Sequence, residues 1–311
     1  MTEISLALGG GGIKGIAHIG VLRVLEKHGF EVKAIAGTSA GGIVGATYAA
    51  GLTPDKIDQI ITQANQKKLF ARAKQEGPAL MGLSGLYELL TTALGDITFN
   101  ELKISFACTS VDLETGQEMI LNQGRVVDAI MATIAVPGIF PAKWINGFQL
   151  VDGGIIDPVP VALARWLAPN LPVVAVCLSP EQKEWAYLPP IDFTSAPLPR
   201  PIVEQISKLR ISQAFRIYLE AMEITSRSVA ELRLQIDTPE VLIRPDVIRF
   251  GILDEVAPEK LMALGEQAAE EAIPEIRKAT AWPRKLPRLF RRANVPGKIL
   301  PVNEDEDEPT Q

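Results

Sequence analysis

Histidine and cysteine are scarce in this chain of 311 residues, and their scarcity excludes much common active-site chemistry. The two cysteines, Cys108 and Cys177, are too few for a disulfide framework or a cysteine-based zinc site. The two histidines, His18 and His28, both lie close to the N-terminus. A general base supplied from elsewhere in the chain must therefore be a different residue type.

Long apolar runs and an excess of basic charge are also absent. No uncharged apolar stretch reaches the roughly 18 residues that a membrane-spanning helix needs, and residues 1–5 lack the basic start of a secretory signal. The formal net charge of −6 argues against a nucleic-acid partner. Because 47% of the residues are hydrophobic and 22% are charged, the composition favours a globular, cytoplasmic protein with a substantial core.

The order of apolar and glycine-rich segments predicts an α/β protein. Residues 4–8 and 32–36 are short apolar runs typical of strands, and glycines connect each run to a helical pattern, at 13–27 and 40–50. Such repeats predict βαβ units around a mostly parallel central sheet. Further strands are expected at 104–111, 118–122, 149–151, 173–178 and 241–244, and further helices at 53–65, 85–94, 126–134, 159–167, 202–233 and 258–277.

One domain is expected over residues 1–278, with a helical C-terminal part at 200–278. Residues 279–311 change character and predict a flexible tail that is first basic and then acidic. The basic part interleaves aromatic and aliphatic residues with its charges, so it is either a solvated segment or a weak anchor that contacts anionic lipid at a membrane surface. Its basic residues are Arg284, Lys285, Arg288, Arg291, Arg292 and Lys298.

A glycine loop, Gly10-Gly11-Gly12-Ile13-Lys14-Gly15, lies between the first strand and the first helix. A dinucleotide site would need an acidic residue at the end of the second strand, which instead ends in Ala36-Gly37-Thr38-Ser39. A phosphate-binding Walker loop fails because Gly15 follows Lys14. Two interpretations remain: a tight turn packed on the sheet, or an oxyanion hole formed by successive backbone N–H groups.

The second glycine motif, Gly37-Thr38-Ser39-Ala40-Gly41, has the pattern G-x-S-x-G at a strand-to-helix junction. Small neighbours permit the strained turn that exposes a nucleophilic serine hydroxyl above a sheet. A structural turn or cap is the alternative. No histidine follows Ser39, so the Ser-Asp-His chain order of the α/β-hydrolases is excluded. His18 either lines a pocket near the glycine loop or packs inside its helix, and His28 belongs to the helix end.

Asp152 is the candidate base. It follows the apolar run 148–151 and precedes Gly153-Gly154. If its strand is parallel to the strand that leads to Ser39, both side chains lie on the same rim of the sheet, where open α/β sheets place their sites. Removal of the carboxylate from water would raise its pKa and make it a better base. A turn aspartate without a catalytic role is equally compatible with the pattern.

Taken together and in this order, these three motifs resemble the patatin-like phospholipase family, in its bacterial form. Residues 18–22, 110–116 and 135–141 add to the resemblance, which covers residues 4–180 and extends only loosely to the helical part. The chain departs from the family pattern in three places. Gly9 stands where relatives often carry Asp or Ser, Lys14 replaces a commoner arginine, and Asp157-Pro158 replaces a stretch that often contains asparagine.

The resemblance implies a three-layer α/β/α fold and a Ser–Asp dyad, with Ser39 as nucleophile and Asp152 as proton acceptor. It also implies an acyl-enzyme mechanism on lipid or lysolipid esters, of the phospholipase A, lysophospholipase or esterase type, without a metal or other cofactor. The alternative is a regulatory or adaptor protein that keeps the fold. The implied oxyanion hole consists of Gly10, Gly11 and Gly12, and the supporting motif residues are Lys14, Gly15, Gly37, Gly41, Gly153 and Gly154.

Overall fold

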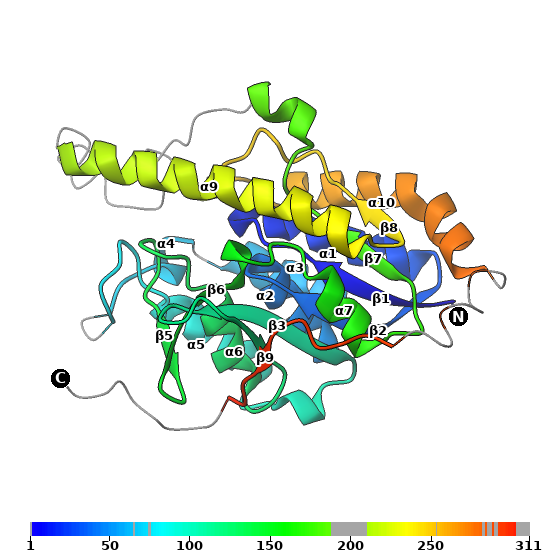
Figure 1. Ribbon diagram of the computed structural model, residues 1–311, viewed down its shortest axis with the longest axis horizontal. Coiled ribbons are helices and arrows are strands. Elements are labelled where there is room, and N and C mark those ends of the chain that lie inside the picture. The colour runs from blue at the N-terminus through cyan, green and yellow to red at the C-terminus, as the bar shows by residue number, and fades with distance from the viewer. Residues whose placement is uncertain are drawn as a thin grey trace.

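One sheet with helices on both faces forms the body of the protein in the computed structural model (Figure 1). The structure describes residues 2–64, 66–73, 76–187, 210–252, 254–281, 284, 288 and 292–302. These residues form the strands β1 (Thr2–Leu8), β2 (Phe30–Gly37), β3 (Ser105–Asp112), β4 (Glu118–Leu121), β5 (Lys143–Ile145), β6 (Phe148–Asp152), β7 (Val173–Val176), β8 (Val241–Ile243) and β9 (Lys298–Ile299).

The centre of the sheet is parallel, as the sequence predicts. The strands β3, β2, β1, β7 and β8 are neighbours in that order, and all adjacent pairs among them are parallel. The remaining part is mixed. Both β4 and β6 pair with β3 in the antiparallel direction, and β5, which the sequence does not predict, forms an antiparallel pair with β6.

Two strands share one edge of β3, and this sharing determines where the site forms. Cys108 pairs with both β2 and β4, so these two strands lie on opposite edges of β3. Ser110 pairs with both β4 and β6, so β6 also lies opposite β4. Therefore β2 and β6 occupy the same edge, one beyond the other. Because β6 is antiparallel to β3, the C-terminal ends of β2 and β6 point toward each other.

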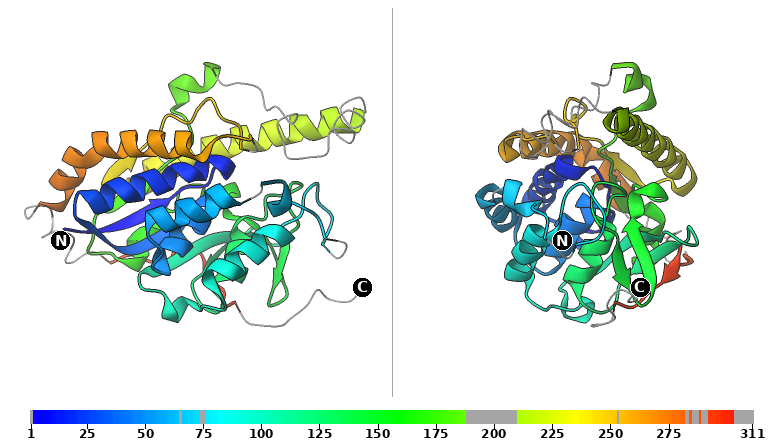
Figure 2. Two further views of the ribbon diagram at one scale, coloured as in Figure 1. Left: turned by 180° about the vertical axis from the view of Figure 1, so that it is seen from behind. Right: turned by 90° about the vertical axis from the view of Figure 1, so that its left-hand side faces the viewer.

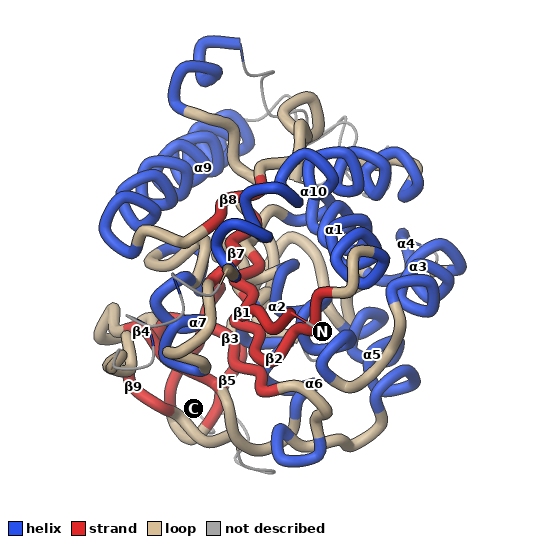
Figure 3. The backbone as a smooth tube through the Cα atoms, turned by 90° about the vertical axis from the view of Figure 1, so that its right-hand side faces the viewer, coloured by secondary structure: helices blue, strands red, loops and turns tan. Residues whose placement is uncertain are grey.

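The helices cover both faces of the sheet and complete three layers, which confirms the expected α/β/α architecture (Figure 3). In β1, Ile4, Leu6 and Leu8 face one core with α1 (Ala17–Lys27) and α10 (Pro258–Thr280), whereas Ala7 faces a second core with α7 (Val161–Leu167) and α9 (Arg210–Asp237). The helices are α1 (Ala17–Lys27), α2 (Ala40–Ala49), α3 (Pro54–Gln63), α4 (Gln66–Leu69), α5 (Ser84–Leu94), α6 (Val126–Thr133), α7 (Val161–Leu167), α9 (Arg210–Asp237) and α10 (Pro258–Thr280), with the 3₁₀ turns η1 (Gly12–Ile16), η2 (Phe99–Glu101), η3 (Gly153–Ile155) and η4 (Gln182–Tyr187).

Part of the predicted tail belongs to the fold. The strand β9 pairs with β4, and Leu300 and Val302 beyond it are buried. The prediction of a flexible tail is therefore wrong for residues 298–302, because their apolar side chains pack against the core. The acidic residues 304–308 lie outside the described residues, as do residues 202–209 of the long helix expected at 202–233.

Candidate active site

Ser39 occupies a strained turn between β2 and α2. Its backbone angles, φ 53° and ψ −121°, are rare for a residue with a side chain. The turn is held in place because the Ser39 N–H donates to Thr133 Oγ1 at 2.9 Å. It also requires glycine on both sides. A Cβ atom at Gly37 would lie 2.6 Å from the Gly42 Cα, and one at Gly41 would lie 2.0 Å from the Leu8 carbonyl oxygen.

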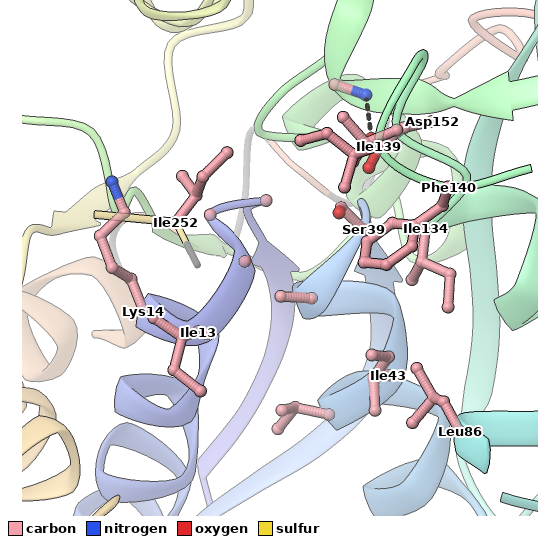
Figure 4. Close-up of a pocket in the computed structure, with 18 of the residues that line it drawn as sticks. Ile13, Lys14, Ser39, Ile43, Leu86, Ile134, Ile139, Phe140, Asp152 and Ile252 are labelled. Atoms are coloured by element: carbon pink, nitrogen blue, oxygen red, sulfur yellow. Dashed lines mark hydrogen bonds between the residues drawn. The ribbon is translucent and has the colours of Figure 1, made fainter. Parts of the chain in front are cut away.

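Asp152 is the last residue of β6, and its carboxylate faces Ser39 (Figure 4). The Ser39 side chain is close enough to this carboxylate to lower its pKa, and the Gly154 N–H donates to Asp152 Oδ1 at 2.7 Å. The Asp152 backbone is fixed as well, since its N–H donates to the Ala135 carbonyl at 3.0 Å. The structure thus brings together the two residues that the sequence places 113 positions apart (152 − 39).

The route by which they meet differs from the predicted one. Asp152 reaches Ser39 although β6 is antiparallel to β3, so the premise of two parallel strands sharing a rim is wrong. Instead, β2 and β6 approach each other end to end along β3. Thr109 of β3 lies between Cys108, which pairs with the end of β2, and Ser110, which pairs with the end of β6. The Thr109 hydroxyl is 2.9 Å from the Thr38 hydroxyl. Gly153 is required here because its Cβ would lie 2.1 Å from Thr109 Oγ1.

The environment of Asp152 makes its carboxylate a stronger base than an exposed aspartate. Its residue surface is 5% exposed, and this burial raises the pKa. The Ser39 side chain and the hydrogen bond from the Gly154 N–H lower the pKa by a smaller amount, so that it reaches about 6 instead of 3.8. At neutral pH the group is mostly ionised and yet accepts a proton more readily than an ordinary aspartate.

The glycine loop lies against the serine turn, since a Cβ atom at Gly10 would be 3.2 Å from Ser39 Cβ. Of the three predicted oxyanion donors, the Gly10 N–H is already bonded to the Pro158 carbonyl at 3.0 Å. In the described part of the chain, the Gly11 and Gly12 N–H groups have no such partner. Gly12 has φ +58°, which favours glycine, and its Cβ would clash with the Ile252 carbonyl oxygen at 2.3 Å.

A further amide near the serine was missed in the sequence. Ala40 is the first residue of α2, and within the described residues its N–H also has no backbone partner, whereas the next two N–H groups bond to Thr38 and Ser39 carbonyls. In α/β-hydrolases with a G-x-S-x-G motif, the residue after the serine supplies an oxyanion donor. Its place directly after Ser39 is therefore the signal that predicts it. Gly15 allows η1 to pack here because its Cβ would lie 2.4 Å from Ala40 Cβ.

Lys14 is buried, and its ammonium points away from Ser39 in Figure 4. Burial lowers its pKa, while the nearby carboxylates of Glu223 and Asp254 act in the opposite direction. In this arrangement Lys14 does not donate to the oxygen of Ser39. The Lys14 side chain therefore lies beside the glycine loop and not beside Ser39 (Figure 4).

Neither histidine takes part in the site as a base. His18 is fully buried, and its Nε2 lies 2.8 Å from the Gly9 carbonyl oxygen. Burial lowers the pKa of His18 to about 4, so its ring is neutral at pH 7 and donates from Nε2 to the glycine loop. His28 lies at the C-terminal end of α1, where it bonds to Glu270 of α10 at 2.7 Å.

Asp157 connects the serine turn with the acid turn through its backbone. Its carbonyl accepts a hydrogen bond from the Thr38 hydroxyl at 2.8 Å, and its N–H donates to the Gly153 carbonyl at 2.9 Å. The side chain is fully buried, and burial together with the nearby Glu118 raises its pKa well above the usual value.

Ser39 and Asp152 lie in the wall of a mainly apolar cavity of about 320 Å³. The long helix α9 contributes Leu219 to the wall, whereas Tyr218 is exposed and the side chains of Ile211 and Phe215 lie outside the described residues. Most of the wall comes from elsewhere. The helices α2, α3 and α5 and the loop after α6 provide Ile43, Val44, Thr47, Ile57, Ile60, Ile61, Leu86, Leu89, Leu90, Ala93, Ile134, Val136, Pro137, Ile139 and Phe140.

Among the described residues, no group of three or more histidine, cysteine, aspartate or glutamate side chains is arranged to hold a metal ion. Over these residues there is likewise no helix with the length and hydropathy required to cross a bilayer.

Comparison with known proteins places the chain in a family. Residues 6–165 match the family model described as patatin-like phospholipase, and the chain belongs to this family. An uncharacterized NTE family protein of Mycobacterium tuberculosis is 32% identical over 165 residues, which are 51% of this chain and 45% of that protein. Lysophospholipase NTE1 of Saccharomyces cerevisiae is 31% identical over 172 residues, which are 52% of this chain and 10% of that protein. The chain thus aligns with less than half the length of these relatives.

A solved structure supports the fold assignment. VipD from Legionella pneumophila superimposes with a TM-score of 0.56 over 89% of this chain and 67% of that chain, at 12% sequence identity. At this identity the similarity concerns the fold alone. It extends beyond the matched residues 6–165, so the helical C-terminal part shares in the common architecture.

Proposed function

We propose that the protein is a lipid acyl hydrolase in which Ser39 is the nucleophile and Asp152 is the general base. The observation that carries the proposal is the meeting of the Ser39 side chain and the buried Asp152 carboxylate at the wall of an apolar cavity. Membership of the patatin-like phospholipase family supports it, as does the similarity to a lysophospholipase.

In the proposed mechanism, the Asp152 carboxylate accepts the hydroxyl proton while Ser39 Oγ attacks the ester carbonyl carbon. The carbonyl oxygen becomes an oxyanion, and the free N–H groups of Gly11, Gly12 and Ala40 are the donors available to stabilise it. Asp152 then returns the proton to the departing alkoxide, which leaves an acyl group on Ser39. In the second half, Asp152 deprotonates a water molecule that attacks the acyl carbon, and it passes the proton to Ser39 Oγ as the bond from Oγ to the acyl group breaks and the fatty acid is released.

The cavity favours an ester with an extended acyl chain. Ile43 and Thr47 follow Ser39 by four and eight positions along α2, so they lie on one helix face beside the nucleophile. With a rise of about 1.5 Å per residue, this face extends about 12 Å from Ser39. Apolar side chains of α3 and α5 surround it, and burial of an acyl chain there contributes about 0.8 kcal/mol per methylene.

The test compares the wild type with Ser39→Ala after incubation with a mixed lipid extract, with the released fatty acids identified by mass spectrometry. We expect release by the wild type and at least a thousandfold loss in Ser39→Ala, as for removal of other catalytic serines. Ser228→Ala is the matched control, because the Ser228 hydroxyl bonds only to the Ile224 carbonyl on α9, at 3.0 Å. Retained hydrolysis by pure Ser39→Ala protein would refute the assignment.

A further inference from the structure

The exposed side chains of α9 that the structure describes carry no charge. Every residue of this helix that is exposed, among those with described side chains, is apolar or neutral. Between the first and last of them α9 rises about 33 Å, at about 1.5 Å per residue. An uncharged exposed side is unusual, because the outer side of a surface helix normally carries its charged residues. The exposed residues, here named the outer face of α9, are Ala214, Ile217, Tyr218, Ala221, Ile224, Thr225, Leu232, Gln235 and Ile236.

Large apolar side chains dominate this face. Ile217, Ile224, Leu232 and Ile236 are 61%, 56%, 57% and 72% exposed. Exposed side chains of this size occur singly on most protein surfaces, but a row of them along one helix marks a contact surface. In Figures 1 and 2 the helix runs along the outside of the molecule, and its N-terminal end extends past the sheet.

The same helix also forms part of the candidate active site. On its inner side, Leu219 and Met222 line the cavity, and the Ser226 hydroxyl donates to the Gly154 carbonyl next to Asp152 at 3.3 Å. Thr225 belongs to both sides, because it is exposed and also lines the cavity. One side of α9 therefore forms the outer face, and the opposite side lines the cavity that contains Ser39.

We propose that the outer face of α9 docks on the surface of a lipid bilayer and so positions the cavity to receive a lipid from it. This inference rests on the proposed function, which makes lipid the substrate. Apolar side chains on this face would enter the boundary between headgroups and acyl chains, with the helix lying in the plane of the interface. Because no exposed side chain of the face is charged, docking carries no cost for removing an ion from water.

A second copy of the chain fits this face less well. Stable protein interfaces involve about 20–30 residues from each partner, packed with good shape complementarity. The outer face of α9 offers nine exposed residues on a single convex helix. A bilayer adapts its shape to such a ridge, so it requires no complementary surface.

The binding test uses sedimentation with phosphatidylcholine vesicles and keeps Ser39→Ala in every protein, so that no lipid is consumed. Ile224→Lys and Leu232→Lys, singly and together, place charges on the face without touching the cavity. We expect each to weaken vesicle binding about tenfold, since each removes an apolar side chain from the interface and adds an ion to it. Leu113→Lys is the matched control, because Leu113 is 53% exposed in the turn after β3, and it should leave binding unchanged.

Two further measurements separate this inference from the proposed function. With Ser39 present, the α9 variants should hydrolyse p-nitrophenyl butyrate, a dissolved ester, at the wild-type rate and lose about tenfold on vesicle lipids. If no protein hydrolyses the dissolved ester, the proposed function fails, while the sedimentation result still decides the docking face. The inference is overturned if wild-type protein does not sediment with vesicles, or if the α9 variants bind as well as Leu113→Lys. A change from dimer to monomer in light scattering, with vesicle binding unchanged, would assign the face to a second copy instead.

Discussion

Replacement of Asp152 by asparagine should abolish hydrolysis and also stabilise the folded protein at neutral pH. Burial raises the pKa of Asp152 from 3.8 to about 6, so the folded protein holds this proton more tightly than the unfolded chain does. The contribution of the protonated acid to stability is present below pH 3.8 and is lost as the pH rises through 6. Above pH 6, the fold therefore contains a carboxylate that would be more stable in water.

The size of this effect follows from the two pKa values. Their difference is about 2 pH units, which corresponds to about 3 kcal/mol at 1.36 kcal/mol per unit. Asparagine has the shape of the protonated acid but does not ionise. We therefore expect Asp152→Asn to raise the free energy of unfolding by up to about 3 kcal/mol at pH 8, and by less than about 1 kcal/mol at pH 4.

Urea unfolding of both proteins at intervals from pH 4 to pH 8 measures this difference directly. Ser39→Ala is the control, because it is equally inactive in the proposed mechanism but keeps the ionisable group, so it should not acquire a stabilisation that grows with pH. The reasoning is refuted if Asp152→Asn is no more stable than the wild type at pH 8. A gain of equal size at pH 4 and pH 8 would also contradict it, since ionisation of Asp152 could not then be the cause.

Three further predictions concern the rate, the cavity and the turn. From pH 7 to pH 5, kcat/KM for a dissolved ester should fall about tenfold around a midpoint near pH 6, because Asp152 becomes protonated. The control variant His28→Ala should show the same fall in kcat/KM. A kcat/KM that does not change with pH over this range would exclude Asp152 as the base. Ala93→Phe should shift the preference toward p-nitrophenyl esters with shorter acyl chains, by about fourfold in rate per excluded methylene. Thr92→Phe, outside the cavity, should not shift it. Equal chain-length profiles for the two variants would contradict the placement of the acyl chain in this cavity. Gly41→Ala should lower the midpoint of thermal unfolding far more than Gly116→Ala, whose Cβ meets open space and whose cost comes only from its φ of +69°. Similar midpoints for the two variants would show that the turn around Ser39 relaxes.

The sequence predicts the parallel centre of the sheet because each of its strands is a short apolar run next to a helical pattern. It does not predict β5, which has only three residues, or the antiparallel direction of β6. The direction of β6 depends on which edge of β3 is free beyond the end of β2. This free edge exists only once the sheet has assembled, so the local sequence does not reveal it. The tail shows the same limit, because residues 298–302 join the fold through pairing with β4, a contact with a distant part of the chain.

At the site, local patterns predict the residues and tertiary contacts determine their use. The motif around Ser39 predicts the strained turn, because small neighbours are a local requirement. The glycine loop predicts amide donors but not which of them are free, since the Gly10 N–H is bonded to Pro158, far along the chain. The sequence does not distinguish the cavity wall from the core, because apolar positions in α3 and α5 have the same spacing whether they face a core or a cavity.

The topology of the sheet also explains how an aspartate can serve without a histidine. An aspartate at the free rim of a parallel sheet would be solvated, and its pKa would stay near 4. Here β6 turns back along β3, so Asp152 is paired with Ser110 inside the sheet and its surface is 5% exposed. The same antiparallel pairing that defeats the simple rim argument therefore buries the carboxylate and raises its pKa toward neutrality. A lone carboxylate becomes an adequate base because of where its strand ends.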